Sequence, residues 1–151
     1  MAKKSGGGGF GTLLLLGLAA FGVAGAGEGG DTADPGGIPG DYLAAYQAAA
    51  DECPALDWEL LAAVGWVETR HGANGGTSSA GAQGPMQFMP ATWAAYDHGS
   101  VWDIDDAAPA AAEYLCVNGL DQGDHDAAIY AYNHSWTYVA TVQAQADAYR
   151  G

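Results

Sequence analysis

One acidic side chain, Glu68, stands out because it continues an apolar stripe. The stretch from Trp58 to about Arg70 predicts a helix in which Leu61, Val64 and Glu68 share one face. A carboxyl group there faces the interior at the negative end of the helix, and both effects raise its pKa. General acid catalysis of glycosidic cleavage requires such a group. The alternative is a solvated Glu at a frayed helix end, paired with Arg70.

The segment that follows, residues 72–88, has no hydrophobic period and is rich in Gly, Ser and Asn. Loops of this length without a pattern are more often functional than not. Three short motifs occur in order, Glu68-Thr69, then Ser78-Ser-Ala-Gly-Ala-Gln-Gly-Pro-Met-Gln87, then Ala131-Tyr-Asn133. Each motif alone is weak evidence, but three in this order at plausible spacing are fairly specific.

This set resembles the lytic transglycosylases of the soluble-lytic type, which are relatives of goose-type lysozyme. The family pattern is Glu-Ser, Ser-x-x-Gly-Ala-x-Gly-Leu-Met-Gln and Ala-Tyr-Asn, and the resemblance covers roughly residues 55–140. Thr69 replaces the usual Ser and keeps its hydroxyl, whereas Pro85 replaces the usual Leu and removes a backbone N–H. The resemblance implies a small lysozyme-like helical domain that cleaves peptidoglycan glycan strands.

The resemblance also implies a mechanism in which Glu68 is the general acid and then the base. Glu68 would protonate the oxygen between N-acetylmuramic acid and N-acetylglucosamine, and would then deprotonate the 6-hydroxyl that closes a 1,6-anhydro ring. The N-acetyl group of the substrate would stabilise the cationic sugar. The hydroxyl of Tyr132 would reach Glu68, although core packing is an alternative for Tyr132 and Met86. The implied glycan groove is lined by Ser78, Met86, Gln87, Tyr132 and Asn133.

Residues 1–27 have the pattern of an export signal. Lys3 and Lys4 precede an uncharged apolar run from Phe10 to Gly27, and Ala24-Gly-Ala26 fits a cleavage site of small residues. The run is only just long enough to span a membrane. A cleaved signal peptide and a retained membrane anchor therefore both stay open, and either one predicts that the rest of the chain is extracytoplasmic.

Export would give the two cysteines a role. Cys53 and Cys116 are the only pair, and a disulfide is the default in an oxidising compartment. Closing a loop of about 64 residues would stabilise the fold by about 4 kcal/mol in the chain-entropy model. Two unpaired buried thiols are the alternative if the chain is not exported.

The rest of the sequence predicts helices. A linker rich in Gly, Asp and Pro over residues 28–40 leads into the expected catalytic domain, residues 41–151. No alternating strand pattern exceeds a few residues, so the expected fold class is all-α. Asp57, Asp124 and Ser135 are the expected N-caps of three helices. The expected helices cover residues 41–52, 58–70, 91–96, 105 or 106 to 117, 125–132 and 136–149.

Charge narrows the range of partners. The chain has 18 acidic residues and four Lys or Arg, with a formal net charge of −14. Nucleic acids are not expected partners, because phosphate binding needs clustered Lys and Arg side chains. Only the N-terminal segment is expected to contact a membrane. The four histidines share no ligand spacing and the acidic runs lack the EF-hand pattern, so neither a metal nor another cofactor is expected. A monomer is assumed, and the oligomeric state stays open.

Two other functions fit the same residues. A hydrolytic muramidase would cleave the same bond with a water held by a second carboxylate, for which the acids between residues 97 and 106 are candidates. A non-catalytic glycan-binding or assembly module would keep the groove without cleaving. Trp93, Trp102 and Trp136 would either stack on sugars or fill the core.

Overall fold

A computed structural model describes residues 37–96 and 99–151 of the chain. The expected signal or anchor, residues 1–27, lies outside the described residues. In the described ranges the only extended pairing is an isolated bridge between Gln83 and Phe88, so the all-α prediction is confirmed. None of the described helices is long and apolar enough to cross a membrane. The elements are α1 (Gly40–Ala50), α2 (Trp58–Thr69), α3 (Pro90–Trp93), α4 (Ile104–Val117), the 3-10 turn η2 (Leu120–Gln122), α5 (His125–Asn133) and α6 (Trp136–Arg150).

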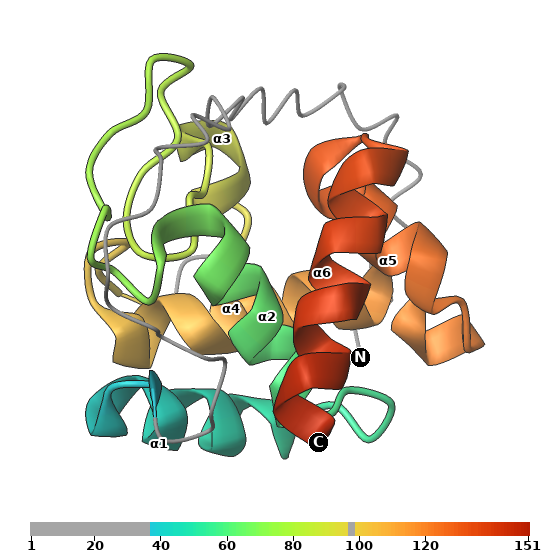
Figure 1. Ribbon diagram of the computed structural model, residues 1–151. Coiled ribbons are helices and arrows are strands. Elements are labelled where there is room, and N and C mark those ends of the chain that lie inside the picture. The colour runs from blue at the N-terminus through green and yellow to red at the C-terminus, as the bar shows by residue number, and fades with distance from the viewer. Residues whose placement is uncertain (1–36, 97–98) are drawn as a thin grey trace, which may run out of the picture.

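Helix α2 is the central element of the domain. It contacts α1, α4 and α6, while α5 packs against α4 and α6 (Figure 1). Every residue from Leu60 to Gly65 is buried. A helix that is apolar on all sides belongs inside a domain. The central position of α2 fixes the place of its C-terminal turn, which carries Glu68.

Three helices begin where their capping side chains predict. The side chains of Asp57, Asp124 and Ser135 each accept a hydrogen bond from a backbone N–H in the first turn of α2, α5 and α6. Each of these bonds satisfies a donor that the helix itself leaves without a partner. The sequence therefore predicts the starts of these helices well.

The predicted start of α4 is wrong by one or two residues. Asp103, not Asp105 or Asp106, is the cap, and its carboxylate accepts from the backbone N–H of Asp105 at 3.0 Å. Ile104 becomes the first helical residue, and its side chain is only 7% exposed. Three acids in four positions offer several possible caps, and the burial of Ile104 selects among them.

The predicted disulfide between Cys53 and Cys116 is present. It joins the segment after α1 to the last turn of α4, across a Cα–Cα distance of 6.2 Å. Ile38, within the expected linker, is also buried in the core. The disulfide therefore holds the end of α1 against α4, and Ile38 adds the segment before α1 to the core.

A buried histidine links three parts of the chain. The Nδ1 and Nε2 atoms of His71, just after α2, lie 3.1 Å from the Tyr46 hydroxyl in α1 and 2.9 Å from the Tyr149 hydroxyl in α6. Burial lowers the pKa of His71 to about 4, with a smaller contribution from the Arg70 charge, so the ring is neutral at pH 7. The absence of a side chain at Gly65 makes room for Tyr46, since a Cβ there would lie 2.0 Å from its hydroxyl oxygen. The turn after Glu68 is therefore held in place by α1 through Tyr46 and by α6 through Tyr149.

Candidate active site

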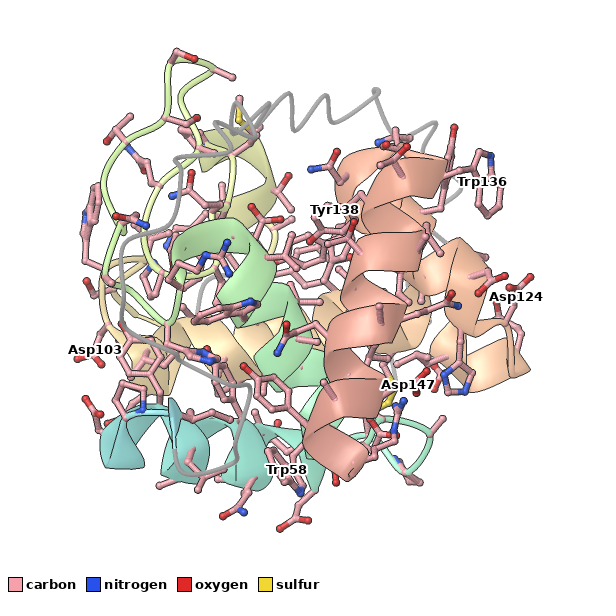
Figure 2. All side chains as sticks on the ribbon, in the orientation of Figure 1. Trp58, Asp103, Asp124, Trp136, Tyr138 and Asp147 are labelled. Atoms are coloured by element: carbon pink, nitrogen blue, oxygen red, sulfur yellow. A yellow bond between two sulfur atoms is a disulfide. The ribbon has the colours of Figure 1, made fainter. Side chains whose placement is uncertain are left out.

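Glu68 lies in the last turn of α2, and its one hydrogen-bonding partner among the described side chains comes from α6. The Tyr138 hydroxyl donates to Glu68 Oε1 at 2.6 Å. The Tyr138 side chain lies on the side of α6 that faces α2 (Figure 2). Glu68 itself is half-buried. The carboxyl group is therefore held in a defined position and still keeps some access to solvent.

The surroundings of Glu68 favour its protonated form. Burial raises the pKa of Glu68 to about 7, and the hydrogen bond from Tyr138 lowers it by a smaller amount. Burial, together with the nearby Glu68 charge, also raises the pKa values of Tyr132 and Tyr138 well above the ordinary value for tyrosine. Both phenols therefore stay protonated at neutral pH. The group at residue 68 can both give and take a proton near pH 7.

The alternative in which Glu68 pairs with Arg70 does not describe this structure. The Arg70 guanidinium lies 4.1 Å from the centre of the Trp66 ring, where it makes a cation–π contact. In the described ranges the only Arg–carboxylate pairs are those of Arg150 with Asp57 and Asp147. The interior-facing position that the helical stripe predicts for Glu68 is confirmed.

Two of the acids between residues 97 and 106 are engaged with backbone N–H groups of their own segment. Asp103 caps α4, and Asp106 accepts a hydrogen bond from the backbone N–H of Ser100 at 2.7 Å. Asp97 lies outside the described residues. No other carboxylate contributes to the raised pKa of Glu68, which comes from burial and is lowered by the hydrogen bond from Tyr138.

Thr69 connects the end of α2 to the loop that follows. Its hydroxyl donates to the carbonyl oxygen of Pro85 at 2.6 Å and accepts from the backbone N–H of Gly72 at 2.9 Å. The chain reverses here because Arg70, His71 and Gly72 all have positive φ angles. The hydroxyl that Thr shares with the usual Ser of the motif therefore forms the joint between Glu68 and the loop.

The long loop is closed by its own hydrogen bonds. The Ser78 side chain accepts from the N–H of Ala82 at 3.0 Å, and Gln83 and Phe88 exchange two backbone bonds. Gly84 has a φ of 77°, and a Cβ there would lie 1.9 Å from the carbonyl oxygen of Val101. Ser78 and Gly84 thus shape the loop, and the Ser78 hydroxyl oxygen is hydrogen-bonded to the backbone of Ala82.

Gln87 holds two parts of this loop together. Its Nε2 donates to the carbonyl oxygens of Gly76 and Gly84 at 2.9 and 2.8 Å. The side chain is 8% exposed, and its backbone has a φ of 53°. A left-handed conformation in a residue other than Gly costs of order 1 kcal/mol, so the loop holds Gln87 against this strain.

Met86 and Tyr132 are both buried in the core. Their side chains are 0% and 1% exposed, and the Tyr132 hydroxyl donates to the carbonyl oxygen of Met86 at 2.8 Å rather than to Glu68. Tyr132 also packs edge-on against Phe88 and Tyr114. These contacts match the core-packing alternative, and they join α5 to the loop beside Glu68.

Asn133 is the last residue of α5, next to Tyr132 and on the chain that leads into α6. Its side chain is half-buried, and the structure gives it no hydrogen bond to another described residue. Its amide is therefore available to a ligand, in contrast to the side chains of Ser78 and Gln87.

Tyr138, five residues after Asn133, is the site residue that the sequence reasoning missed. The only signal for it is its place on the buried face of α6, shared with Val142.

The two segments that lie beside Glu68 contain no Asp, Glu, Lys or Arg. They are residues 71–96, which form the loop and α3, and residues 127–146, which include the end of α5 and most of α6. The acidic side chains labelled in Figure 2, which are Asp103, Asp124 and Asp147, lie on other parts of the domain. A chain with a net charge of −14 therefore keeps formal charges out of the segments around Glu68.

A separate hollow of about 370 Å³ lies away from Glu68. Its walls come from the start of α1 and the start of α4, and they include Tyr42, Trp102 and Asp103. Among the described residues the one cluster of metal-ligand type comprises Cys53, Cys116 and Asp121, and its two sulfur atoms form the disulfide. Neither feature adds a group to the site at Glu68.

Comparison with known proteins identifies the family of the chain. The family model described as the transglycosylase SLT domain matches residues 45–150. Neither the curated proteins nor the solved structures compared with the chain include a significant match. The matched range contains Glu68, the whole loop and the Ala131-Tyr-Asn133 motif, and it covers more than half of the chain. The chain therefore belongs to the transglycosylase SLT domain family.

Proposed function

We propose that this protein is a peptidoglycan lytic transglycosylase in which Glu68 is the general acid and then the general base. Membership of the SLT family supports a glycan-cleaving activity of this type. The observation that carries the assignment to Glu68 is its half-buried carboxyl group, with a pKa raised to about 7 and a hydrogen bond from Tyr138. Such a group exchanges a proton at neutral pH, which both halves of the reaction require.

In the first half of the reaction, Glu68 gives its proton to the glycosidic oxygen between N-acetylmuramic acid and N-acetylglucosamine. The bond from this oxygen to C1 of the muramic acid breaks, and the glucosamine leaves with a 4-hydroxyl group. The carbonyl oxygen of the substrate's N-acetyl group stabilises C1. Tyr138 donates to the Glu68 carboxylate that this step forms.

In the second half, the Glu68 carboxylate takes the proton of the 6-hydroxyl of the same muramic acid. The 6-oxygen then bonds to C1, which closes the 1,6-anhydro ring and leaves Glu68 protonated for the next cycle. No water is consumed, so no second carboxylate is needed to position one. The engagement of Asp103 and Asp106 with backbone N–H groups favours this route over hydrolysis.

Substrate contacts on this proposal fall into two groups. Asn133 offers its amide directly to sugar hydroxyls, since no described residue occupies it. Ser78, Gln87, Met86 and Tyr132 contribute by shaping the wall beside Glu68, through the internal hydrogen bonds described above. The uncharged segments around Glu68 suit a sugar backbone, which is recognised by hydrogen bonds and stacking.

The proposed location is extracytoplasmic, where peptidoglycan lies. The disulfide between Cys53 and Cys116 supports an oxidising compartment. Either a cleaved signal or a retained anchor at residues 1–27 would deliver the domain there.

Product masses test the proposal. Purified peptidoglycan is digested with the oxidised protein and with the Glu68→Gln variant, and the fragments are analysed by mass spectrometry. We expect anhydro-ended fragments from the parent protein and none from the variant. Reducing-end fragments, heavier by one water, would identify a muramidase instead, and binding without any cleavage would identify a glycan-binding module.

The hydrolytic alternative has its own test at Asp97. The Asp97→Asn variant removes the one acid of the 97–106 segment that lies outside the described residues. On the proposed mechanism this variant keeps its rate of product formation. A large loss of rate together with reducing-end products from the parent would assign Asp97 the role of holding a water.

A further inference from the structure

An aromatic pair lies on the surface at the junction of α5 and α6. Trp136, the first residue of α6, is 64% exposed, and its ring lies 4.7 Å from that of Tyr130 at an interplanar angle of 31°. Three large hydrophobic side chains are exposed in the described ranges: Trp102, Val117 and Trp136. Trp136 is the most exposed of them and the only one in contact with another ring. The contact with Tyr130 covers part of one face of the indole and leaves the rest of the ring exposed.

The pair lies at the end of α6 that carries Tyr138, the hydrogen-bonding partner of Glu68. Trp136 precedes Tyr138, the partner of Glu68, by two residues, and it follows Asn133 by three. Positions two apart on a helix project to different sides, and Figure 2 shows Trp136 and Tyr138 on opposite sides of the same end of α6. A helix with its side chains is about 10–12 Å across. Only a few sugar residues are needed to cross from Glu68 to Trp136.

We propose that the Trp136–Tyr130 pair is a glycan-stacking subsite, on which a sugar ring rests when a strand bound at Glu68 continues across the N-terminal end of α6. This inference rests on the proposed function. The flat exposed face of Trp136 suits the apolar C–H face of a pyranose ring. Residues 127–146 contain no Asp, Glu, Lys or Arg, and the carboxylate of Asp126, one turn before Tyr130 on α5, is engaged by the Gln143 amide.

The occupant that fits this pair is a sugar strand rather than a second copy of the chain. The pair adjoins Asn133, whose amide has no hydrogen bond to a described residue, and it shares the N-terminal end of α6 with Tyr138, the partner of Glu68. One indole supported by one phenol offers the area of a single sugar ring. A stable protein dimer buries about 800 Å² on each partner, which is much larger than this pair.

The test compares two exposed tryptophans. Trp136→Ala and the matched control Trp102→Ala, whose ring is 52% exposed on the distant hollow, are each made in the full oxidised chain carrying Glu68→Gln to prevent cleavage. Binding of chitotriose and chitohexaose is measured by calorimetry, and binding to insoluble peptidoglycan by sedimentation. We expect Trp136→Ala to weaken chitohexaose and peptidoglycan binding about tenfold, as loss of one stacked ring does, and to change chitotriose binding less than about twofold. Trp102→Ala should change none of them.

Two results would overturn the subsite in different ways. Equal affinity of the two alanine variants for every glycan, with binding by the Glu68→Gln parent intact, would remove the subsite and leave the proposed function standing. No binding of any glycan by that parent would remove the proposed function and the subsite together. A dimer of the parent in analytical ultracentrifugation that Trp136→Ala converts to monomer would assign the pair to self-association instead. Circular dichroism spectra and melting temperatures of both variants show whether the fold is unchanged.

Discussion

The two sides of the site at Glu68 are built in different ways. The loop side, residues 72–89, carries the longest sequence motif, and its polar side chains bond to the loop itself, as Ser78 and Gln87 do. The α5–α6 side carries only the short Ala-Tyr-Asn motif, yet it supplies the hydrogen-bond donor to Glu68 and the exposed Trp136. The comparison shows that the residues of a sequence motif can serve to hold the structure around a catalytic group, and not only to contact its substrate.

Gly84→Ala should have the largest effect on the loop side. The added Cβ meets the Val101 carbonyl oxygen at 1.9 Å in a residue with a φ of 77°, so we expect a loss of about 2–4 kcal/mol of unfolding free energy. Gly123→Ala is the matched control, since Gly123 has a φ of 75° and open space around it. It should cost only about 1 kcal/mol, from backbone strain. Urea unfolding of both variants measures the difference, and equal losses would mean that the contact with Val101 is relieved at little cost.

Glu68→Gln should change stability in a pH-dependent manner. The folded-state pKa of about 7 lies above the model value of 4.5, so the folded state binds the proton more tightly. The stability associated with this proton is fully present below about pH 4.5 and is lost as the pH rises through 7. The Gln variant has no such loss and should be more stable than the parent by about 1–3 kcal/mol at pH 8, with little difference at pH 4.5. Denaturant unfolding at the two pH values measures this, and a pH-independent difference would contradict the raised pKa.

Thr69→Val should weaken the joint between α2 and the loop. It removes the hydroxyl that bonds to Pro85 and Gly72 and leaves the buried Pro85 carbonyl without that donor, at an expected cost of about 1–3 kcal/mol. Thr69→Ser keeps the hydroxyl and is the control, expected to lose less than about 1 kcal/mol. Melting temperatures at one pH separate the two. A Val variant as stable as the Ser variant would mean that the hydroxyl does not hold the loop.

Tyr138→Phe should have the smallest effect on stability but should shift the pH dependence. The hydrogen bond from Tyr138 lowers the pKa of Glu68, so its loss raises that pKa further. The acid form of Glu68 then persists to higher pH, and the alkaline limb of the cleavage rate should move upward by about one pH unit or less. Tyr132→Phe is the comparison, because its hydroxyl bonds to the Met86 backbone. Tyr132→Phe should lower stability without an equal shift of the alkaline limb. Identical pH profiles for Tyr138→Phe and the parent would mean that Tyr138 does not lower the pKa of Glu68.

Much of the fold could be predicted from local chemistry. Asp57, Asp124 and Ser135 identify three helix starts because an N-cap side chain acts within one turn of its own helix. The apolar stripe likewise predicts that Glu68 faces inward. The start of α4 was harder to predict, since Asp103 and its acidic neighbours offer similar caps and the choice depends on the burial of Ile104.

The partner of Glu68 could not be predicted in the same way. Tyr138 lies 70 residues further along the chain, on a helix face that it shares with Val139, Val142 and Tyr149. Nothing in the spacing of that helix distinguishes a tyrosine that packs from one that donates to a distant carboxylate. The same limit applies to Tyr132, which could have reached Glu68 and instead bonds to Met86. Contacts between distant segments depend on the packing of whole helices.

The central claim is that Glu68 delivers the sugar's own 6-hydroxyl to C1, rather than a water. The most direct test is digestion of peptidoglycan by the oxidised protein in water labelled with heavy oxygen, followed by mass spectrometry of the new muramic acid ends. The account predicts anhydro ends that carry no heavy oxygen, formed by the parent protein and not by Glu68→Gln. Reducing ends that each carry one heavy oxygen atom would contradict it and show that Glu68 works with a bound water.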